Sequence, residues 1–186
     1  MKKKTLKIYF NAPITLSFVG ICLIALALNS VTNGESNYVV FSTFGSSWFN
    51  PMTYVRLVCH VFGHADLSHL LSNMMYILLL GPMLEEKYGN RLCIVILVTA
   101  VVTGVVHNII QPNVFLLGAS GVVFAFILLT SITGTQDGIP VTLIFVAILW
   151  LGNELLSSMG FDNISQITHI IGGLSGASLG LIFKDR

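Results

Sequence analysis

The stretch GASG at residues 118–121 opens directly into the apolar run VVFAFILL at residues 122–129. A hydroxyl at the start of an apolar helix serves either as a helix cap or as a nucleophile. As a cap, Ser120 would satisfy a backbone amide of the first turn. As a nucleophile, it needs a base within reach and hydrogen-bond donors for an oxyanion. The flanking glycines, Gly118 and Gly121, let other backbone come close, which suits a functional site.

The composition predicts an integral membrane protein. The 186 residues are 54% hydrophobic and only 9% charged, and the mean hydropathy is +0.85. Soluble domains carry about 25% charged residues, so this chain has too little polar surface to face water on all sides. The net charge of +1 gives no electrostatic case for a nucleic-acid partner. The three cysteines show neither metal-binding nor disulfide spacing.

Apolar runs predict an all-α, polytopic protein with six transmembrane helices in a single domain, residues 1–186. The predicted spans are residues 13–28, 67–88, 91–110, 120–134, 141–156 and 165–183. Asp66 is the predicted cap of the second span. Residues 1–12 form an N-terminal tail. Residues 29–65 form a long outer loop, rich in aromatic residues, that we expect to lie at the membrane interface with short helices of its own. A cleaved secretory signal in the first run is the alternative.

The positive charges predict the orientation of this bundle. Arg56 alone falls on one side, and the remaining lysines and arginines fall on the other: Lys2, Lys3, Lys4, Lys7, Lys87, Arg91, Lys184 and Arg186. The positive-inside rule therefore places both termini in the cytoplasm, and we expect a multi-pass protein of a bacterial cell membrane.

Three polar groups are predicted to share one depth in the membrane. The span from Ser120 is about 22 Å long, against a hydrocarbon core of about 30 Å, so Ser120 lies about 8 Å below the outer surface. His69 and Asn73, four residues apart, share a face near the start of the second span. His169 lies about 6 Å into the sixth. Buried polar groups in membranes are costly and usually functional, although a polar clasp between helices is the alternative for His69 and Asn73.

Small residues offer a way to bring Ser120 and His169 together. Gly172, Gly176 and Gly180 repeat every four residues on the face that carries His169. We expect this ridge to pack on Gly121 and Ala125 of the fourth span, with Phe124 beside the imidazole ring. Helix packing alone is the alternative explanation of the glycines, but it does not explain the histidine.

A serine and a histidine in contact can carry out acyl transfer, with His169 as base and Ser120 as nucleophile. The candidate oxyanion donors are the Ser120 amide, the Asn73 side chain and the His69 ring. No carboxylate obviously orients His169, so we predict a dyad; Glu154 and Asp162 are the possible exceptions. We predict no metal and no cofactor, because no acid follows His60 as a zinc motif requires.

Two further histidines are given structural roles. His64 is interpreted as a residue that fastens its loop by a hydrogen bond, and His107 as an interfacial residue near the outer end of the third span.

The ordered motifs resemble those of the rhomboid family of intramembrane serine proteases. Residues 64–73 match its H-x4-H-x3-N motif, residues 118–121 its G-x-S-G motif and residues 169–172 its H-x2-G motif. The resemblance runs from about residue 13 to residue 183. Each motif is weak by itself, but the set, in order on helices two, four and six, is specific.

The resemblance implies catalysis by Ser120 and His169, oxyanion stabilisation by His69 and Asn73, and a role for Glu85 on the cytoplasmic side. It also implies that the fifth helix is a lateral gate and that the substrates are transmembrane segments of other proteins. Two positions depart from the family: Phe124 replaces a frequent tyrosine, and Val55 precedes Arg56 where the family has tryptophan. A non-catalytic relative that binds transmembrane helices and a small transporter are the alternative functions. The sequence predicts neither the natural substrate and cleavage site nor the oligomeric state.

Overall fold

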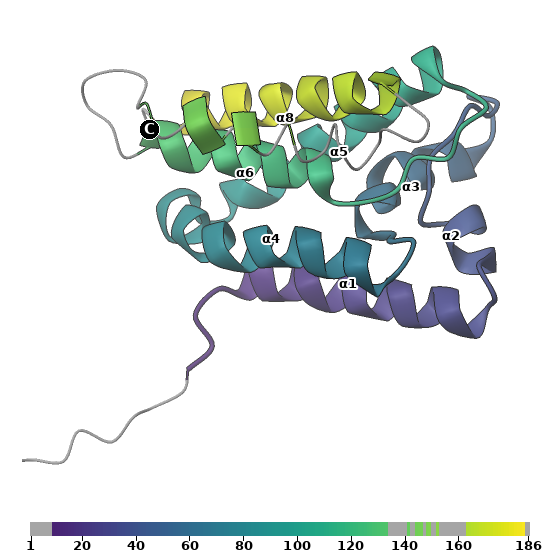
Figure 1. Cartoon of the computed structure of the whole chain (residues 1–186), viewed down its shortest axis with the longest axis horizontal. Helices are drawn as coiled ribbons and strands as arrows, with labels where there is room; N and C mark the ends of the chain where they lie inside the picture. The colour runs from purple at the N-terminus through teal and green to yellow at the C-terminus, as the bar shows by residue number, and fades with distance from the viewer. Residues whose placement is uncertain are drawn as a thin grey trace, which may run out of the picture.

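The computed structural model describes residues 9–133, 141, 144–146, 148, 149, 152 and 163–184, and the regular structure in this part of the chain is helical (Figure 1). Its elements are α1 (Pro13–Val31), α2 (Glu35–Val39), α3 (Pro51–Cys59), the 3₁₀ turn η1 (His60–Phe62), α4 (Leu67–Tyr88), α5 (Arg91–Ile110), α6 (Ser120–Thr133) and α8 (Asn163–Lys184). The predicted spans at 67–88 and 91–110 coincide with α4 and α5.

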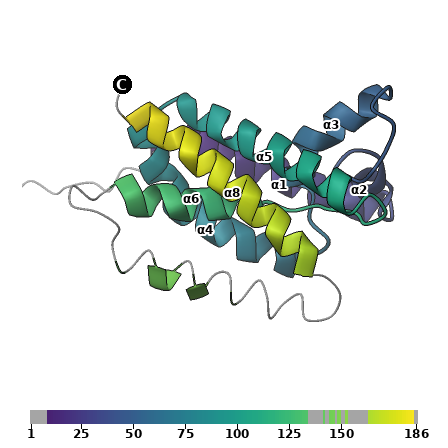
Figure 2. The same ribbon diagram turned by 90° about the horizontal axis from the view of Figure 1, so that it is seen from above.

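The long helices form a bundle in which α4 lies between α1 and α6, while α8 packs against both α5 and α6 (Figures 1 and 2). The core between them is built from apolar side chains that are almost completely buried, including Leu70, Ile77, Leu92, Val95 and Leu129. This arrangement brings the first turn of α6, which begins at Ser120, next to the N-terminal half of α8, which carries His169.

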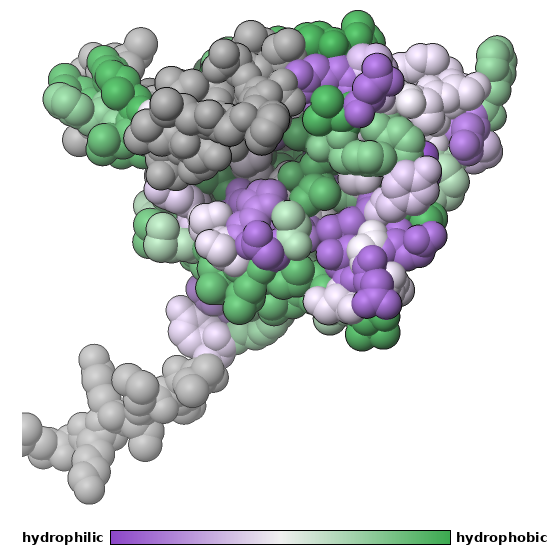
Figure 3. Space-filling model, turned by 45° about the vertical axis from the view of Figure 1, so that its right-hand side comes forward, coloured by the Kyte–Doolittle hydropathy of each residue, from purple (hydrophilic) through white to green (hydrophobic). Residues whose placement is uncertain are grey.

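Three described helices, α1, α4 and α5, are long and apolar enough to cross a membrane. Shorter apolar helical stretches cover Ser120–Ser131 and Thr168–Phe183. Many large apolar side chains on these helices are exposed, such as Ile24, Leu79 and Leu97, and one face of the molecule shows broad apolar areas beside hydrophilic ones (Figure 3). Such a surface suits hydrocarbon rather than water. The predicted fifth span lies largely outside the described residues, so the count of six stays a prediction.

Both described ends of the chain meet the turn between α4 and α5. At the start of α1, Glu85 of α4 accepts hydrogen bonds from the amides of Ile14 (2.8 Å) and Thr15 (2.9 Å) and from the Thr15 hydroxyl (2.9 Å). At the end of α8, Arg91 of α5 donates to the carbonyl of Phe183 at 3.1 Å. The two ends therefore lie on one side of the bundle, which agrees with termini on the same side of a membrane. Their assignment to the cytoplasm stays a prediction.

Glu85 acts as a helix cap supplied from another helix, because Ala12 at the N-cap position of α1 makes no side-chain cap bond. We expect Glu85→Ala to leave two first-turn amides of α1 without an acceptor and to cost on the order of 1–2 kcal/mol of stability. Thermal unfolding of the purified protein in detergent measures this loss. The neighbouring Glu86 is exposed, so Glu86→Ala is the matched control; equal losses in both variants would contradict the capping role.

A buried arginine ties two parts of the long outer segment to each other. Arg56 of α3 donates from Nε to the carbonyl of Val39 at 3.0 Å, and its guanidinium lies 4.4 Å from the centre of the Phe44 ring. The predicted short helices within residues 29–65 are present as α2, α3 and η1. Arg56 thus braces this segment internally, with Val55 before it where the family pattern has tryptophan.

Candidate functional site

The first turn of α4 presents His69 and Asn73. Asp66 is the N-cap, as predicted, and its carboxylate accepts from the His69 amide at 2.8 Å. Asn73 is buried, and its amide nitrogen donates to the His69 carbonyl one turn earlier at 2.9 Å. The Asn73 side chain is therefore directed along its own helix in this state, and one of its two amide hydrogens is engaged there.

The irregular segment 111–119, which leads into α6, is fixed by backbone contacts to the outer segment. Thr43 and Leu116 exchange a pair of hydrogen bonds of 2.8 and 2.9 Å, and Gly45 donates to the Pro112 carbonyl at 2.8 Å. The Gly118 amide donates to the His60 carbonyl at 2.9 Å. Irregular backbone at membrane depth requires such partners, because lipid provides none.

Two buried histidines support this segment, and their roles were not apparent from the sequence. His107 is fully buried and its Nε2 lies 2.9 Å from the Val114 carbonyl, so its interpretation as an interfacial residue was wrong. His60, also buried, places Nε2 3.0 Å from the Ala100 carbonyl of α5. The loop after α5 folds back onto the His107 ring, and the periodicity of the helix gives no sign of that contact.

Ser120 and His169 face each other, although 49 residues separate them. Ser120 Oγ lies 3.1 Å from Nε2 and 3.2 Å from Nδ1 of the imidazole. Both residues are buried, with 4% and 6% of their surfaces exposed. Since the two distances are nearly equal, the hydroxyl does not lie on the in-plane lone-pair axis of either nitrogen. A rotation of the ring would align one nitrogen with the hydroxyl.

Glycines of α8 let it approach both neighbouring helices closely. A Cβ built on Gly172 would collide with the Thr103 side chain of α5, and one on Gly176 would collide with Thr99 of α5 and lie 3.2 Å from Ala125 of α6. A Cβ built on Gly121 of α6 would lie 3.1 Å from the same Thr103 hydroxyl. The ridge was predicted to pack on Gly121 and Ala125 of α6, and it also packs on α5.

Phe124 and Gly180 complete the contact between α6 and α8. Phe124 is buried and packs directly against Gly173, where a Cβ would meet its ring, and Gly180 lies against Leu129 in the same way. The signal that could have revealed the α5 contact is the pair Thr99 and Thr103. These hydroxyl-bearing residues lie four apart, and so on one face, within the otherwise apolar stretch 92–106 of α5.

Gly118 separates the His69 ring from Ser120. Its φ of +125° belongs to a region that side chains disfavour. A Cβ built there would lie 2.8 Å from His69 Nε2 and 4.0 Å from Ser120 Oγ. The absence of a side chain thus keeps a small space open between the imidazole and the hydroxyl.

His64 fastens the loop before α4, as interpreted from the sequence. Its Nδ1 lies 3.1 Å from the Phe62 carbonyl, its own carbonyl accepts from the Asn37 amide at 3.0 Å, and its ring packs edge-on against His69 with centroids 5.0 Å apart. Burial, reinforced by the positive charge of protonated His69, lowers the pKa of His64 to about 4. The ring is therefore neutral at neutral pH.

This lowered pKa predicts a loss of stability in acid. Because the folded-state pKa lies below the ordinary 6.5, stability is fully present above pH 6.5 and is lost as the pH falls towards 4. The contribution of His64 is on the order of 3 kcal/mol. We expect His64→Asn, which keeps a donor near Phe62, to unfold with a shallower dependence on pH between 6.5 and 4. Part of the dependence should remain, because burial also lowers the pKa of His60 to about 4. An unchanged pH profile in the variant would refute this.

The structure thus gathers Ser120, His169, His69 and Gly118, flanked by Gly121 and Gly172. Asn73 lies on the same α4 face as His69 but is bonded along its helix, and Glu85 lies at the opposite end of α4, near the α4–α5 turn. Glu154 and Asp162, considered as orienting carboxylates, lie outside the described residues.

Known proteins resemble this chain over most of its length. A family model described as the rhomboid domain matches residues 51–186. Proteins named rhomboid protease GlpG from Yersinia pseudotuberculosis serotype I (strain IP32953) and Yersinia pestis (strain Pestoides F) are each 29% identical over 174 residues, which cover 88% of this chain. The protein of that name from Serratia proteamaculans (strain 568) is 24% identical over 170 residues. This chain spans about 60% of the length of these relatives.

Proposed function

The chain belongs to the rhomboid family, and we propose that this multi-pass membrane protein is a serine endopeptidase that cleaves transmembrane segments of other membrane proteins. The observation that carries the proposal is the contact between Ser120 Oγ and the His169 imidazole, 3.1 Å from Nε2, at the start of an apolar helix. A polar pair buried in hydrocarbon is costly to maintain, and acyl transfer is the chemistry these two side chains perform together.

In the proposed reaction, His169 accepts the hydroxyl proton while Ser120 Oγ attacks the carbonyl carbon of the scissile peptide bond. The resulting tetrahedral intermediate collapses when the C–N bond breaks and His169 returns the proton to the leaving amine. Water then attacks the acyl-enzyme with His169 again as base, which releases the second product and restores the serine. Because Oγ is almost equally distant from both ring nitrogens, the His169 ring must first rotate slightly. Catalytic hydrogen bonds are often poorly aligned in substrate-free enzymes and become aligned when the substrate binds.

The oxyanion would form in the space beside Gly118. His69 Nδ1 faces the Ala65 amide at 3.5 Å, an arrangement that suits the tautomer with its proton on Nε2, directed towards Gly118. The Ser120 amide is a first-turn N–H that no carbonyl of α6 accepts, and it is a second donor. Asn73 becomes a third donor when its amide turns away from the His69 carbonyl.

The wider setting follows the sequence predictions. We propose six spans with both termini in the cytoplasm, the Ser120 site open to the outer half of the membrane, and entry of substrate beside the fifth helix. The dyad needs no metal or cofactor.

Covalent labelling of the serine tests the proposal directly. A fluorophosphonate probe should label the purified protein in detergent, with the adduct mapped to Ser120 by mass spectrometry, and the same preparation should cut a model transmembrane substrate within its membrane segment. The non-catalytic alternative predicts binding of the substrate without labelling or cleavage. Labelling at another serine would refute the assignment of the nucleophile.

Gly118→Ala should suppress cleavage while the protein stays folded. The added methyl would meet His69 Nε2, and the backbone would be strained at a φ of +125°. Loss of one oxyanion donor slows acyl transfer about 10²–10³-fold. Cleavage rates under single-turnover conditions measure the effect, and Gly20→Ala, whose Cβ would meet nothing within 4 Å, is the control. Parental activity in Gly118→Ala would contradict the proposed oxyanion site.

A further inference from the structure

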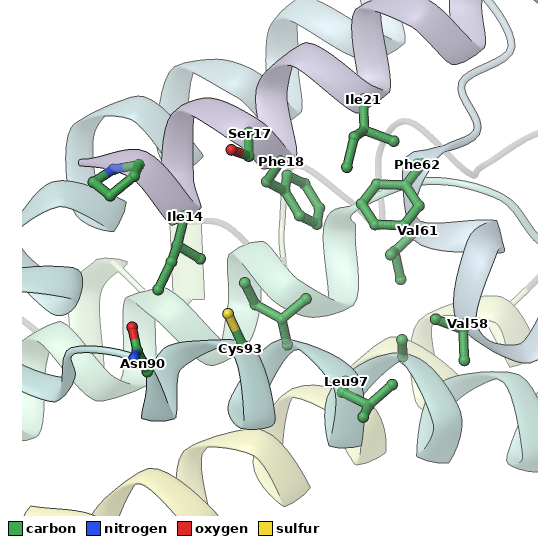
Figure 4. A pocket seen from close by; sticks show the side chains of 13 residues that line it. Ile14, Ser17, Phe18, Ile21, Val58, Val61, Phe62, Asn90, Cys93 and Leu97 are labelled. Carbon is green, nitrogen blue, oxygen red and sulfur yellow. The ribbon is translucent and has the colours of Figure 1, made fainter. Parts of the chain in front are cut away.

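The loop between η1 and α4, residues 63–66, is held on two sides. On one side, Val61 and Phe62 of η1 line an apolar groove between α1 and α5 (Figure 4), and the Phe62 ring lies 5.0 Å from the Phe18 ring of α1. These contacts are apolar and fix no polar group. On the other side, a Cβ built on Gly63 would collide with the Phe41 carbonyl. The outer segment therefore lies directly against the backbone of this loop.

Asn37 of α2 makes a polar contact between the outer segment and this loop. Its side-chain amide donates to the His64 carbonyl at 3.0 Å, while its own backbone carbonyl accepts from the Ser42 hydroxyl at 2.7 Å. Asn37 is buried, and its Oδ1 has no hydrogen-bond partner in the described part of the chain. Burying an amide with an unpaired oxygen costs stability. The position therefore indicates a function for the bond that the amide makes with His64.

A single peptide unit lies between the Asn37 amide and the His69 ring. The His64 carbonyl and the Ala65 amide belong to the same trans peptide, so they point in opposite directions. Asn37 donates to the carbonyl, and the Ala65 amide faces Nδ1 of His69 at 3.5 Å. A donor on the carbonyl polarises the peptide and strengthens its N–H as a donor. Nδ1 of His69 is then an acceptor, and the ring proton lies on Nε2, beside Gly118.

We propose that Asn37 is a positioning residue that fixes the tautomer of His69. Acting through the peptide between them, it keeps the ring proton on Nε2, directed at the proposed oxyanion space beside Gly118. The inference rests on the proposed protease function, in which His69 is an oxyanion donor, and in this role Asn37 acts through His69 and not on the substrate. At 3.5 Å the contact between Ala65 and His69 is long. It therefore depends on a peptide that is held firmly, and Asn37 holds its carbonyl end.

The tautomer can be measured without reference to activity. Ring-nitrogen NMR of the histidine-labelled full chain is recorded in detergent at about pH 8, where rings of ordinary pKa are neutral, and the His69 signals are assigned by their loss in His69→Gln. Asn37→Leu keeps the shape of the side chain but removes the donor, so it should shift the tautomer ratio of His69 about threefold towards Nδ1–H. Ser42→Ala, which loses a hydrogen bond to the same residue but keeps the amide, should leave the ratio unchanged. Equal ratios in Asn37→Leu and the parental protein would overturn the proposal. If Asn37→Leu unfolds at a lower temperature than Ser42→Ala, Asn37→Ala removes the donor without apolar bulk and takes its place.

Cleavage kinetics on the same variants test whether the tautomer matters to the reaction. An oxyanion donor acts in the transition state, so Asn37→Leu should lower kcat about tenfold and leave KM unchanged. Ser42→Ala should change neither constant. A parental kcat in a variant whose His69 tautomer has shifted would overturn the positioning role. A parental protein that cuts no transmembrane substrate would instead overturn the proposed function, and the NMR result would then still show whether Asn37 sets the tautomer.

Discussion

Replacing Ser120 with alanine is expected to abolish cleavage of a transmembrane substrate, and His169→Ala is expected to have the same effect. The two side chains act as one unit, since Oγ is nucleophilic only when the imidazole takes its proton. Each variant should therefore lose at least about 10⁴-fold in the single-turnover rate, and the double variant should be no slower than either. Purified proteins in lipid vesicles with a fluorescent transmembrane substrate give these rates.

A matched control lies on the same helix. Ser131 of α6 donates to the Ile127 carbonyl at 2.8 Å, so Ser131→Ala removes a serine hydroxyl from α6 without touching His169. Its rate should equal that of the parental protein. Cleavage by Ser120→Ala would show that Ser120 is not the nucleophile. Additive losses of rate in the double variant would show that the two side chains act separately.

The second large effect is expected from Gly172→Ala, three residues after His169. Its Cβ would collide with the Thr103 Oγ1, and it would approach the Thr103 Cβ to 2.9 Å, so rotation of the stiff, branched side chain does not relieve the contact. Helix α8 must then move away from α5 and carry His169 with it. A displacement of about 1 Å at a reacting group can cost about 10²-fold in rate.

Thr103→Gly is the compensating change, because it removes both the Oγ1 and the Cβ that the new methyl would meet. The double variant Gly172→Ala with Thr103→Gly should recover most of the parental rate, whereas no recovery is expected when Gly172→Ala is combined with Ser131→Ala. Thermal unfolding separates loss of position from loss of fold. An unimpaired Gly172→Ala, or a double variant as slow as Gly172→Ala, would show that this contact does not position His169.

Local pattern was sufficient to predict several elements of the fold. The spans at 67–88 and 91–110, the Asp66 cap and the start of α6 at Ser120 agree with the structure. Length of an apolar run, a capping carboxylate and a terminal glycine are properties of consecutive residues, and they act wherever the helix is placed. The proximity of Ser120 and His169 was also predictable. A helix rises by a fixed length per residue, so the depth of each side chain in the membrane follows from its position in its helix.

Other features required contacts between distant residues. The residues around His107 do not indicate that the loop after α5 packs on it. The sequence also does not decide whether the Asn73 side chain faces Ser120 or bonds to its own helix. Glu85 was expected to serve the cytoplasmic side, but its role as the cap of α1 depends on where that helix begins in space. Each of these side chains has several hydrogen-bond partners of similar energy, and only the packed chain selects among them.

The sequence by itself determined that this is a helical membrane protein with a serine and a histidine at a common depth, because hydropathy and helix rise are local quantities. Only the tertiary structure decided that Thr99 and Thr103 of α5 fill the places left by Gly176 and Gly172, and that α1 and α5 leave a groove between them. Close packing depends on the shapes of surfaces from separate helices, and that complementarity exists only once the helices are side by side.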